Sequence, residues 1–332
     1  MHVIAEIGNT HEGSVGLAKQ FIKVASECGV DAVKFQVHNF EAESLLSAPN
    51  PAYFQDETRK EYFERTSFLR KEWSELKEFA ESKCGVEFLA SPFSNEAVDL
   101  LDSLDIKMFK IASGEVTNLP MLKKVGQLKK SVLLSSGMSN WCEIDAAVQC
   151  LTENGCDDLT ILQCTSDYPC LPENSGLNIL DEIRIRYPKH KIGYSDHTLG
   201  VAIPIAAACK GATVIEKHFT LSKKMYGSDA QFSSEPDEFK ALVDALRGVE
   251  RGLNCEINKD TKARSLCTMK NTFEKMIVAA TDLPKGTIIK ESDLAYKKPM
   301  NGISASKYKL VIGQEVQQDL LKDMPIIMDL NE

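Results

Sequence analysis

The chain has 332 residues, of which 43% are apolar and 26% are charged, and its formal net charge at pH 7 is -9. This is an ordinary composition for a globular protein, long enough for one large domain and one small one. The negative charge argues against a nucleic-acid partner, and no apolar run approaches the length of a membrane span. The negative net charge does not exclude an anionic substrate, because an anion site needs only a few local lysines.

The ten cysteines form no C-x-x-C pair and are scattered over expected helices, strands and loops. We therefore expect reduced thiols in a cytoplasmic protein. A strand is expected to begin almost at once, at Val3, which leaves no room for a targeting segment before it.

Apolar runs rich in β-branched residues alternate with segments of helical period along the first 250 residues. The expected strands are Val3–Ile7, Ala32–Val37, Glu87–Ala90, Met108–Ile111, Ser131–Ser135, Leu159–Gln163, Lys191–Tyr194 and Thr213–Glu216. The expected helices are Gly16–Cys28, Lys71–Ser82, Ala97–Leu104, Pro120–Val125, Glu143–Leu151, Leu177–Ile185, a small-residue segment within Leu199–Thr213, and Pro236–Leu253. Eight strands, each followed by a helix, without a Rossmann-type glycine fingerprint after the first strand, favour an α/β fold of the closed (β/α)8 TIM-barrel type.

Chemistry in such a barrel collects at the carboxyl ends of the strands. Each expected end carries polar residues: Glu6; Lys34 with Gln36; Ser91; Lys110 with Ser113 and Glu115; Ser135; Thr165 with Ser166; Ser195 with His197; and Glu216 with His218. A single serine or lysine at a strand end usually just meets solvent. The complete set on one face is much harder to dismiss, and it predicts a functional site there.

Lys34 and Lys110 lie among serines at similar depth. Two ammonium groups ringed by hydroxyls suit a small dianion that carries phosphate or carboxylate. The alternative is that both lysines are ordinary charges on the rim, which would be the better interpretation of either one alone.

His197 and His218 are candidate metal ligands, because neutral imidazole is the commonest nitrogen ligand. Spacing alone favours equally a pair of hydrogen-bonded core histidines. Glu6, Asp196 and Glu216 shift the balance towards a metal, and a nitrogen–oxygen ligand set without thiolate suits manganese, cobalt or magnesium better than structural zinc. The other histidines are expected at the surface or in loops (His2, His38, His190) or, for His11, along the mouth of the barrel.

The loop Met225–Asp229 follows the last expected strand and could present Asp229 to a polyol, although a plain surface loop is nearly as good an interpretation. Beyond Leu253 the composition becomes polar. We expect a barrel domain over 1–254, a linker over 255–271 and a small β-rich domain over 272–332, near the lower size limit for independent stability.

The strand-end motifs resemble those of the sialic acid (nonulosonate) synthases, in the order of that family and over nearly the whole chain. They include Ala5-Glu6-Ile7-Gly8, Lys34-Phe35-Gln36, Ser91-Pro92-Phe93, Lys110-Ile111-Ala112-Ser113-Gly114-Glu115, Ser135-Ser136-Gly137-Met138, Thr165-Ser166-Asp167-Tyr168-Pro169, Tyr194-Ser195-Asp196-His197-Thr198 and Glu216-Lys217-His218-Phe219. The tail, with Asp282-Leu283-Pro284-Lys285-Gly286 and Asn301-Gly302, resembles the family's antifreeze-like (SAF) domain.

The resemblance implies a transferase that condenses phosphoenolpyruvate with an open-chain N-acetylated mannosamine-type sugar, releases phosphate and forms a nine-carbon 2-keto acid. It implies a divalent metal, usually Mn²⁺, on His197 and His218, with Glu6 beside it. From the chemistry of the reaction, our hypothesis is that a carboxylate, Glu6 or Glu216, orients the water that adds to carbon 2. The resemblance also implies a domain-swapped homodimer. Phosphoenolpyruvate would contact Lys34, Ser91, Lys110, Ser113, Ser135, Ser166 and Ser195, and the sugar would contact Gln36, Glu115, Tyr168, Asp229 and Lys298.

Three positions depart from the family's usual residues: Thr10, Tyr226 and Lys298, the last in place of an arginine. Since arginine and lysine are not interchangeable at a bidentate contact, the departures bear on recognition of the sugar. N-acetylmannosamine is the expected substrate. The alternatives are a 2,4-diacetamido-2,4,6-trideoxyhexose, giving legionaminic or pseudaminic acid, and a barrel that binds sugar without catalysis.

Overall fold

The computed structural model of the protein describes residues 1–50, 57–227 and 229–328. The chain divides into two compact units, Met1–Asn254 and Cys255–Glu332. Ser228 of the expected sugar-facing loop and the last four residues of the expected tail domain, 329–332, lie outside the described residues.

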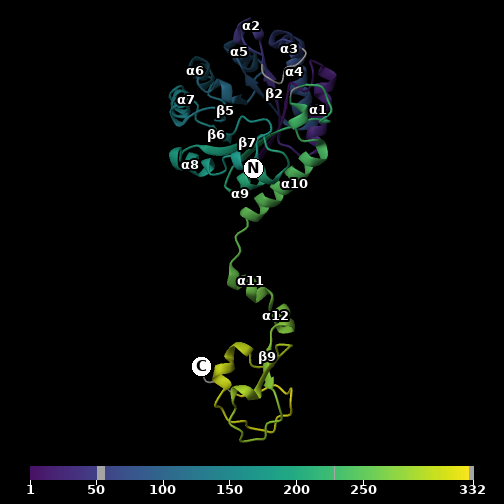
Figure 1. Ribbon diagram of the computed structural model, residues 1–332, viewed down its shortest axis with the longest axis vertical. Coiled ribbons are helices and arrows are strands. Elements are labelled where there is room, and N and C mark those ends of the chain that lie inside the picture. The colour runs from purple at the N-terminus through teal and green to yellow at the C-terminus, as the bar shows by residue number, and fades with distance from the viewer. Residues whose placement is uncertain (51–56, 228, 329–332) are drawn as a thin grey trace. The chain divides into compact units, whose positions relative to one another are not determined.

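The first unit is a closed barrel of eight parallel strands, in which β1 pairs with both β2 and β8 (Figure 1). This confirms the predicted fold class. The strands are β1 His2–Gly8, β2 Ala32–Val37, β3 Glu87–Pro92, β4 Met108–Ile111, β5 Ser131–Ser135, β6 Leu159–Cys164, β7 Lys191–Asp196 and β8 Val214–His218. Several strands run one or two residues further than predicted, because polar residues at their ends still belong to the ladder.

The helices that connect the strands are α1 Val15–Glu27, α2 Phe40–Glu43, α3 Arg59–Thr66, α4 Arg70–Glu78, α5 Asn95–Ser103, α6 Leu119–Gln127, α7 Trp141–Glu153, α8 Ile179–Arg186, α9 Ala202–Cys209 and α10 Pro236–Leu253. Local sequence explains several starts. Ser14 and Ser94 accept hydrogen bonds from the third backbone N–H beyond them, and Asn140 forms a reciprocal capping box with Glu143.

Two helical predictions need correction. The segment within Leu199–Thr213 forms only the short α9, because Gly200 and Gly211 on either side of it have φ values of +77° and +91°, outside the helical region. The predicted helix Lys71–Ser82 changes at Phe79 from α-helical to π-helical turns, which run to Cys84. The short helices α2 and α3 were not predicted.

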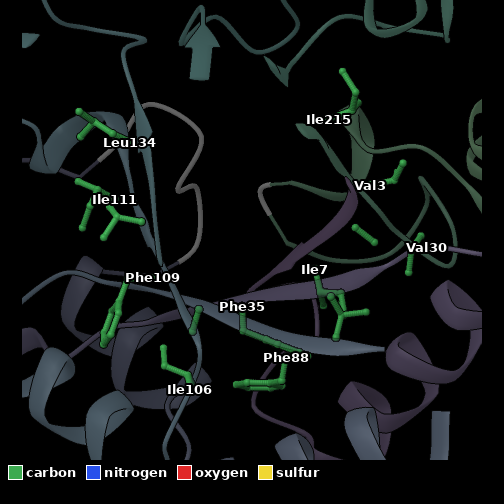
Figure 2. Close-up of a cluster of buried hydrophobic side chains, with 14 of the residues drawn as sticks. Val3, Ile7, Val30, Phe35, Phe88, Ile106, Phe109, Ile111, Leu134 and Ile215 are labelled. Atoms are coloured by element: carbon green, nitrogen blue, oxygen red, sulfur yellow. The ribbon is translucent and has the colours of Figure 1, made fainter. Parts of the chain in front are cut away.

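Strand alternation sorts the barrel residues into two environments. Side chains that point outwards meet the helices in a buried apolar layer that includes Phe35, Phe88 and Phe109 (Figure 2). Side chains that point inwards at one level fill the barrel with a second apolar cluster: Ile4, Ala32, Leu89, Leu133, Leu162 and Val214, with Met108 against it. This inner cluster closes the barrel below the strand ends.

The second unit is small and contains the antiparallel pair β9 Met276–Ala279 and β10 Leu294–Lys297. Isolated bridges, such as Leu283 with Leu320, extend the pairing around an apolar core. The stretch expected to be a linker contains two short helices, α11 Lys259–Ser265 and α12 Cys267–Phe273. A further short helix, α13 Tyr308–Val311, follows later in the unit. The sequence had predicted the β-rich character but not these helices.

Across the residues that the structure describes, we find no helix with the length and apolarity needed to cross a membrane. The cytoplasmic location expected from the sequence stays a prediction.

Candidate active site

A polar layer lies directly above the apolar cluster that fills the barrel. Seven of its eight members follow an apolar inward-facing residue by two positions, as Glu6 follows Ile4 and Lys110 follows Met108, and the eighth, Ser195, follows Gly193. Because side chains alternate along a strand, the next inward-facing residue towards the carboxyl end of each strand is polar and lies directly above the barrel core. The layer comprises Glu6, Lys34, Ser91, Lys110, Ser135, Cys164, Ser195 and Glu216.

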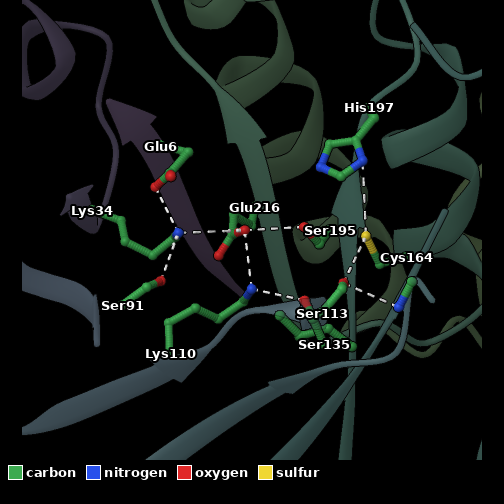
Figure 3. A network of polar contacts seen from close by, with 12 residues as sticks. Glu6, Lys34, Ser91, Lys110, Ser113, Ser135, Cys164, Ser195, His197 and Glu216 are labelled. Carbon is green, nitrogen blue, oxygen red and sulfur yellow. Dashed lines mark hydrogen bonds and ion pairs between the residues drawn. The ribbon is translucent and has the colours of Figure 1, made fainter. Parts of the chain in front are cut away.

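Two lysines and two carboxylates form the centre of this layer (Figure 3). Lys34 Nζ lies 2.7 Å from Glu6 Oε2 and 3.8 Å from Glu216 Oε1. Lys110 Nζ lies 3.4 Å from the same Glu216 oxygen. All four side chains are buried, so the charges must balance one another, and here two positive charges face two negative ones.

Serines complete the hydrogen bonding of this centre. Lys34 Nζ donates to Ser91 Oγ at 3.3 Å, and Lys110 Nζ donates to Ser135 Oγ at 2.7 Å. Ser195 Oγ donates to Glu216 Oε1 at 3.0 Å. Glu216 Oε2 is buried and has no hydrogen-bond partner among the described residues. One carboxylate oxygen thus remains available to a ligand or a water molecule.

The charge states follow from these contacts. Burial alone would raise the pKa of Glu216, but Lys110 and Lys34 outweigh it and bring that pKa down to about 2. Burial likewise opposes the charge of both lysines. The pKa of Lys34 rises nevertheless because Glu216 and Glu6 both face it, whereas the pKa of Lys110 falls because burial outweighs the pull of Glu216.

His197 and His218 face each other at the rim, with ring centroids 5.4 Å apart. His197 Nδ1 lies 2.7 Å from the backbone carbonyl of Thr165, which can only accept, so this nitrogen carries the proton. The lone pair of His197 then lies on Nε2, which accepts from Tyr168 Oη at 3.1 Å. Burial lowers the pKa of His218, whereas the pKa of His197 rises because Cys164 and the Thr165 carbonyl outweigh its burial.

This arrangement fits two imidazole ligands of a divalent metal. A ligating histidine generally donates its other N–H to a carbonyl or carboxylate, as His197 does to Thr165. Among the described residues, no group of three or more His, Cys, Asp or Glu side chains is arranged to hold an ion. The protein would supply two nitrogens and leave the other positions to ligand and water.

Asp196 was expected as a further carboxylate for a metal, but its side chain points away from the cavity. Strand alternation places it opposite to Ser195 and His197, where Lys217 Nζ donates to its Oδ2 at 2.5 Å. Both side chains are buried, and Asp196 Oδ1 also accepts from the Thr198 backbone and hydroxyl. The pair ties β7 to β8 directly beside the two histidines, and the metal-ligand interpretation of Asp196 is wrong.

Above the polar layer the barrel opens into a cavity of about 640 Å³. Every residue that the resemblance assigned to phosphoenolpyruvate, the sugar, the metal or catalysis lines it except Lys298: Glu6, Lys34, Gln36, Ser91, Lys110, Ser113, Glu115, Ser135, Ser166, Tyr168, Ser195, His197, Glu216, His218 and Asp229. Lys298 belongs to the second unit, where its Nζ lies 5.2 Å from the centre of the Phe273 ring, and its assignment to the sugar stays a prediction.

One wall of this cavity was not predicted from the sequence. The segment between β2 and β3 contributes His38, Glu43, Arg59, Tyr62 and Phe63. His38 was expected at the surface or in a loop, but its side chain is only 8% exposed and is stacked between aromatic rings. Cys164 was also missed. The signal in the sequence was its position two residues after Leu162, which faces the inside of the barrel, and the structure pairs it with Ser195 in the β6–β7 ladder.

His11 does not line the mouth as expected. It is fully buried and stacked on Phe68, with ring centroids 4.5 Å apart, and its Nδ1 accepts from the Gly13 backbone. Burial, assisted by Arg65, lowers the pKa of His11 to about 3. Protonation of this ring must therefore oppose folding.

We expect the stability of the protein to fall on acidification through His11. The folded pKa is depressed below the unfolded value of 6.5, so the unfolded chain binds more protons between pH 6.5 and 3. The stabilisation is complete above pH 6.5 and should fall by about 2 kcal/mol between pH 6.5 and 4.5. Urea unfolding at several pH values will measure this slope. His11→Asn should have a flatter slope, and an equal slope in both proteins would contradict the prediction.

Comparisons with known proteins agree with this architecture. The NeuB family model matches residues 21–258, and the SAF domain model matches residues 274–329. The chain is 39% identical to the N,N'-diacetyllegionaminic acid synthase of Campylobacter jejuni over 97% of both chains. It is 35% identical to the human N-acetylneuraminate-9-phosphate synthase, over 89% of this chain and 82% of that one.

Among solved structures, the fold matches the N-acetylneuraminic acid (sialic acid) synthetase of Leptospira borgpetersenii in complex with citrate. The TM-score is 0.69 at 29% identity, over 82% of this chain and 91% of that one. Agreement of the family models, the near full-length relatives and the fold shows that the chain belongs to the NeuB family of nonulosonate synthases and carries a C-terminal SAF domain.

Proposed function

We propose that the chain condenses phosphoenolpyruvate with an open-chain 2,4-diacetamido-2,4,6-trideoxyhexose and forms N,N'-diacetyllegionaminic acid and phosphate. The main support for this type of reaction is the buried layer of two lysines and their serines at the base of an open cavity. N-acetylmannosamine, giving N-acetylneuraminate, is the second candidate. The substrate choice departs from the expectation of the sequence analysis, because the diacetyllegionaminic acid synthase of Campylobacter jejuni is similar over nearly the whole chain.

Phosphoenolpyruvate would occupy the base of the cavity. Lys34 and Lys110 would face its charged groups, and hydroxyls of Ser113, Ser166 and neighbouring serines would donate to its oxygens. Residue 137 must be glycine for these hydroxyls to take their positions, because a Cβ on it would lie 2.4 Å from Ser166 Oγ and 2.7 Å from Ser113 Oγ. Citrate in the Leptospira relative is consistent with a site that favours small polyanions.

The reaction needs one carbon–carbon bond and one water molecule. Carbon 3 of the enol attacks the sugar aldehyde, whose oxygen takes up the electron pair and then a proton. Water adds to carbon 2 and gives a proton to a base, and the phosphate leaves carbon 2 with its bridging oxygen, which leaves the 2-keto acid. Neither Glu6 Oε2 nor Glu216 Oε2 has a hydrogen bond among the described residues, but Glu6 Oε2 lies 2.7 Å from Lys34 Nζ, so Glu216 is the better placed of the two carboxylates for that water.

We propose a divalent metal, most suitably Mn²⁺, with Mg²⁺ or Co²⁺ as alternatives, on His197 and His218. Such an ion supplies Lewis-acid stabilisation for the oxygen of the aldehyde. The chain's own contribution is the fixed orientation of His197, set by the Thr165 carbonyl, and the nearby Tyr168 hydroxyl. Asp229, whose Oδ2 lies 3.8 Å from His218 Nδ1, would face the sugar.

The wall of the cavity supports the choice of a less polar sugar. Tyr62, Phe63, Phe93, Phe232 and Met138 present rings and a thioether to the space above the polar layer. These groups suit the methyl groups of two acetamido substituents and the methyl at carbon 6, which the trideoxy sugar has in place of a hydroxymethyl group. Glu115 and Gln36 supply the polar contacts nearby.

We also propose that the protein works as a domain-swapped homodimer. Large apolar side chains stand exposed on loops that follow the barrel strands, among them Leu46 at 84%, Met138 at 64% and Leu199 at 60%. Of these, Met138 also lines the cavity, so a partner that covers this side chain would lie over the site. The tail unit of a second copy would cover them and bring its Lys298 to the sugar.

Phosphate release from phosphoenolpyruvate, measured with each sugar in turn and Mn²⁺ present, tests this proposal. We expect kcat/KM for 2,4-diacetamido-2,4,6-trideoxymannose to exceed that for N-acetylmannosamine by about tenfold or more, since one well-matched apolar group contributes about 1–3 kcal/mol. A preference for N-acetylmannosamine would support the second candidate instead. The absence of turnover with every sugar, together with measurable sugar binding, would support the non-catalytic alternative.

A further inference from the structure

His38 follows β2 and lies in the wall of the cavity between two phenylalanine rings. Its ring is parallel to Phe63, at a centroid distance of 3.9 Å and an angle of 6°, and is stacked on Phe93 at 4.1 Å and 22°. The side chain is 8% exposed. Both faces of the imidazole are therefore covered, and only its edge is available for polar contacts.

Both nitrogens at that edge have partners. His38 Nδ1 lies 2.8 Å from Glu43 Oε1, and His38 Nε2 lies 3.1 Å from Gln36 Oε1. The second oxygen of Glu43 accepts from the backbone N–H of Asn39 at 3.1 Å, which favours the ionised carboxylate. Glu43 is thus an acceptor only, and Nδ1 must donate to it.

The orientation of the Gln36 amide decides the state of the other nitrogen. Gln36 Nε2 donates to Glu6 Oε1 at 2.8 Å, while Lys34 Nζ lies 2.7 Å from Glu6 Oε2 and holds that group as a carboxylate. A flipped amide would set its oxygen against a carboxylate oxygen, with no proton between them. Gln36 therefore presents its oxygen to His38, and Nε2 must donate as well.

We infer that His38 is held as an imidazolium and is a positioning residue that fixes Gln36, and through it Glu6, for the acceptor sugar. Of the charged groups on the elements around it, Glu43 of α2, Arg59 of α3 and Glu115 after β4 line the same cavity. Three further carboxylates line a second pocket that His38 also borders: Glu41 of α2, Glu64 of α3 and Glu96 of α5. The two phenylalanine rings offer their negative faces to the cation.

The inference deepens the proposed function and rests on it for the identity of the sugar. A fixed Gln36 uses one N–H for Glu6 and retains the other for the cavity, whereas its oxygen is directed towards His38. Gln36 therefore offers its second N–H to the sugar. It would select an acceptor oxygen, such as an acetamido carbonyl.

The protonation state can be tested without turnover. In protein labelled with ¹⁵N-histidine, we expect both nitrogens of His38 to give imidazolium shifts at pH 7.5, with the signal assigned by its loss in His38→Phe. Glu43→Gln should remove the charge that stabilises the cation and shift His38 towards a neutral ring. A single unprotonated nitrogen in the wild-type protein at pH 7.5 would overturn the inference.

The positioning role has a separate kinetic test. His38→Phe retains an aromatic ring between Phe63 and Phe93 but removes both donors, and His190→Phe is the matched control on a loop outside the cavity. We expect KM for the sugar to rise about tenfold in His38→Phe, as for loss of one hydrogen bond to a charged group, with KM for phosphoenolpyruvate within twofold. Glu43→Gln should show the same split.

Equal changes in both KM values, or none in either variant, would overturn the positioning role. Circular dichroism of both variants establishes that they fold. If the wild-type protein turns over no sugar, the proposed function fails and the positioning role fails with it, while the protonation state of His38 is decided independently by its nitrogen shifts.

Discussion

Lys110→Met is expected to weaken phosphoenolpyruvate binding by about 10²- to 10³-fold, because truncation of one member of a buried charge pair costs about 2–5 kcal/mol. The methionine fills a similar volume but removes the ammonium that faces both Ser135 and Glu216. Glu216 would then retain only Lys34, whose Nζ lies 3.8 Å away, as a cationic partner. The polar layer would have one cation against two carboxylates and would repel an anion.

Isothermal titration with phosphoenolpyruvate alone measures this loss directly, without dependence on the sugar or on turnover. Lys123→Met, on the exposed side of α6, makes the same chemical change outside the cavity and should bind as the wild type does. Lys110→Gln provides a second variant in case the methionine destabilises the barrel. Wild-type affinity in a folded Lys110 variant would show that this lysine does not hold the substrate.

The polar layer was predictable because it depends on a local rule. Strand alternation makes Lys34 follow Ala32, and Glu216 follow Val214, on the inner face, so identifying the strands identified the floor of the site. The same rule could have excluded Asp196, which lies one residue from Ser195 and must face the opposite side. It was misassigned because residue type was considered before strand parity.

The wall of the cavity was not predictable in the same way. His38 and Phe63 reach it from a segment between β2 and β3 whose short helices, α2 and α3, are too brief to give a periodic signal. Their place depends on tertiary packing, such as the stacking of His38 between Phe63 and Phe93. The bounds of α9 were also not predictable, because nothing in its alanine-rich sequence indicated that Gly200 and Gly211 have positive φ values.

His197→Gln and His218→Gln are each expected to abolish Mn²⁺ binding and to reduce phosphate release by about 10³-fold, since Lewis-acid stabilisation of a developing oxyanion contributes several kcal/mol. With two imidazoles as the protein's ligands, loss of either leaves one, too few to hold the ion. The electron paramagnetic resonance signal of free Mn²⁺, recorded during titration with protein, measures binding independently of activity.

Chelation should act on the wild-type protein as the substitutions do. Removal of metal with EDTA should abolish phosphate release, and added Mn²⁺ should restore it in the wild type but not in either variant. His190→Gln, on a loop outside the cavity, controls for the loss of a histidine. Undiminished Mn²⁺ affinity in both rim variants would place the ion elsewhere. Full activity after chelation would mean that the aldehyde oxygen is stabilised by protein donors alone, and the Tyr168 hydroxyl, 3.1 Å from His197 Nε2, is one such donor.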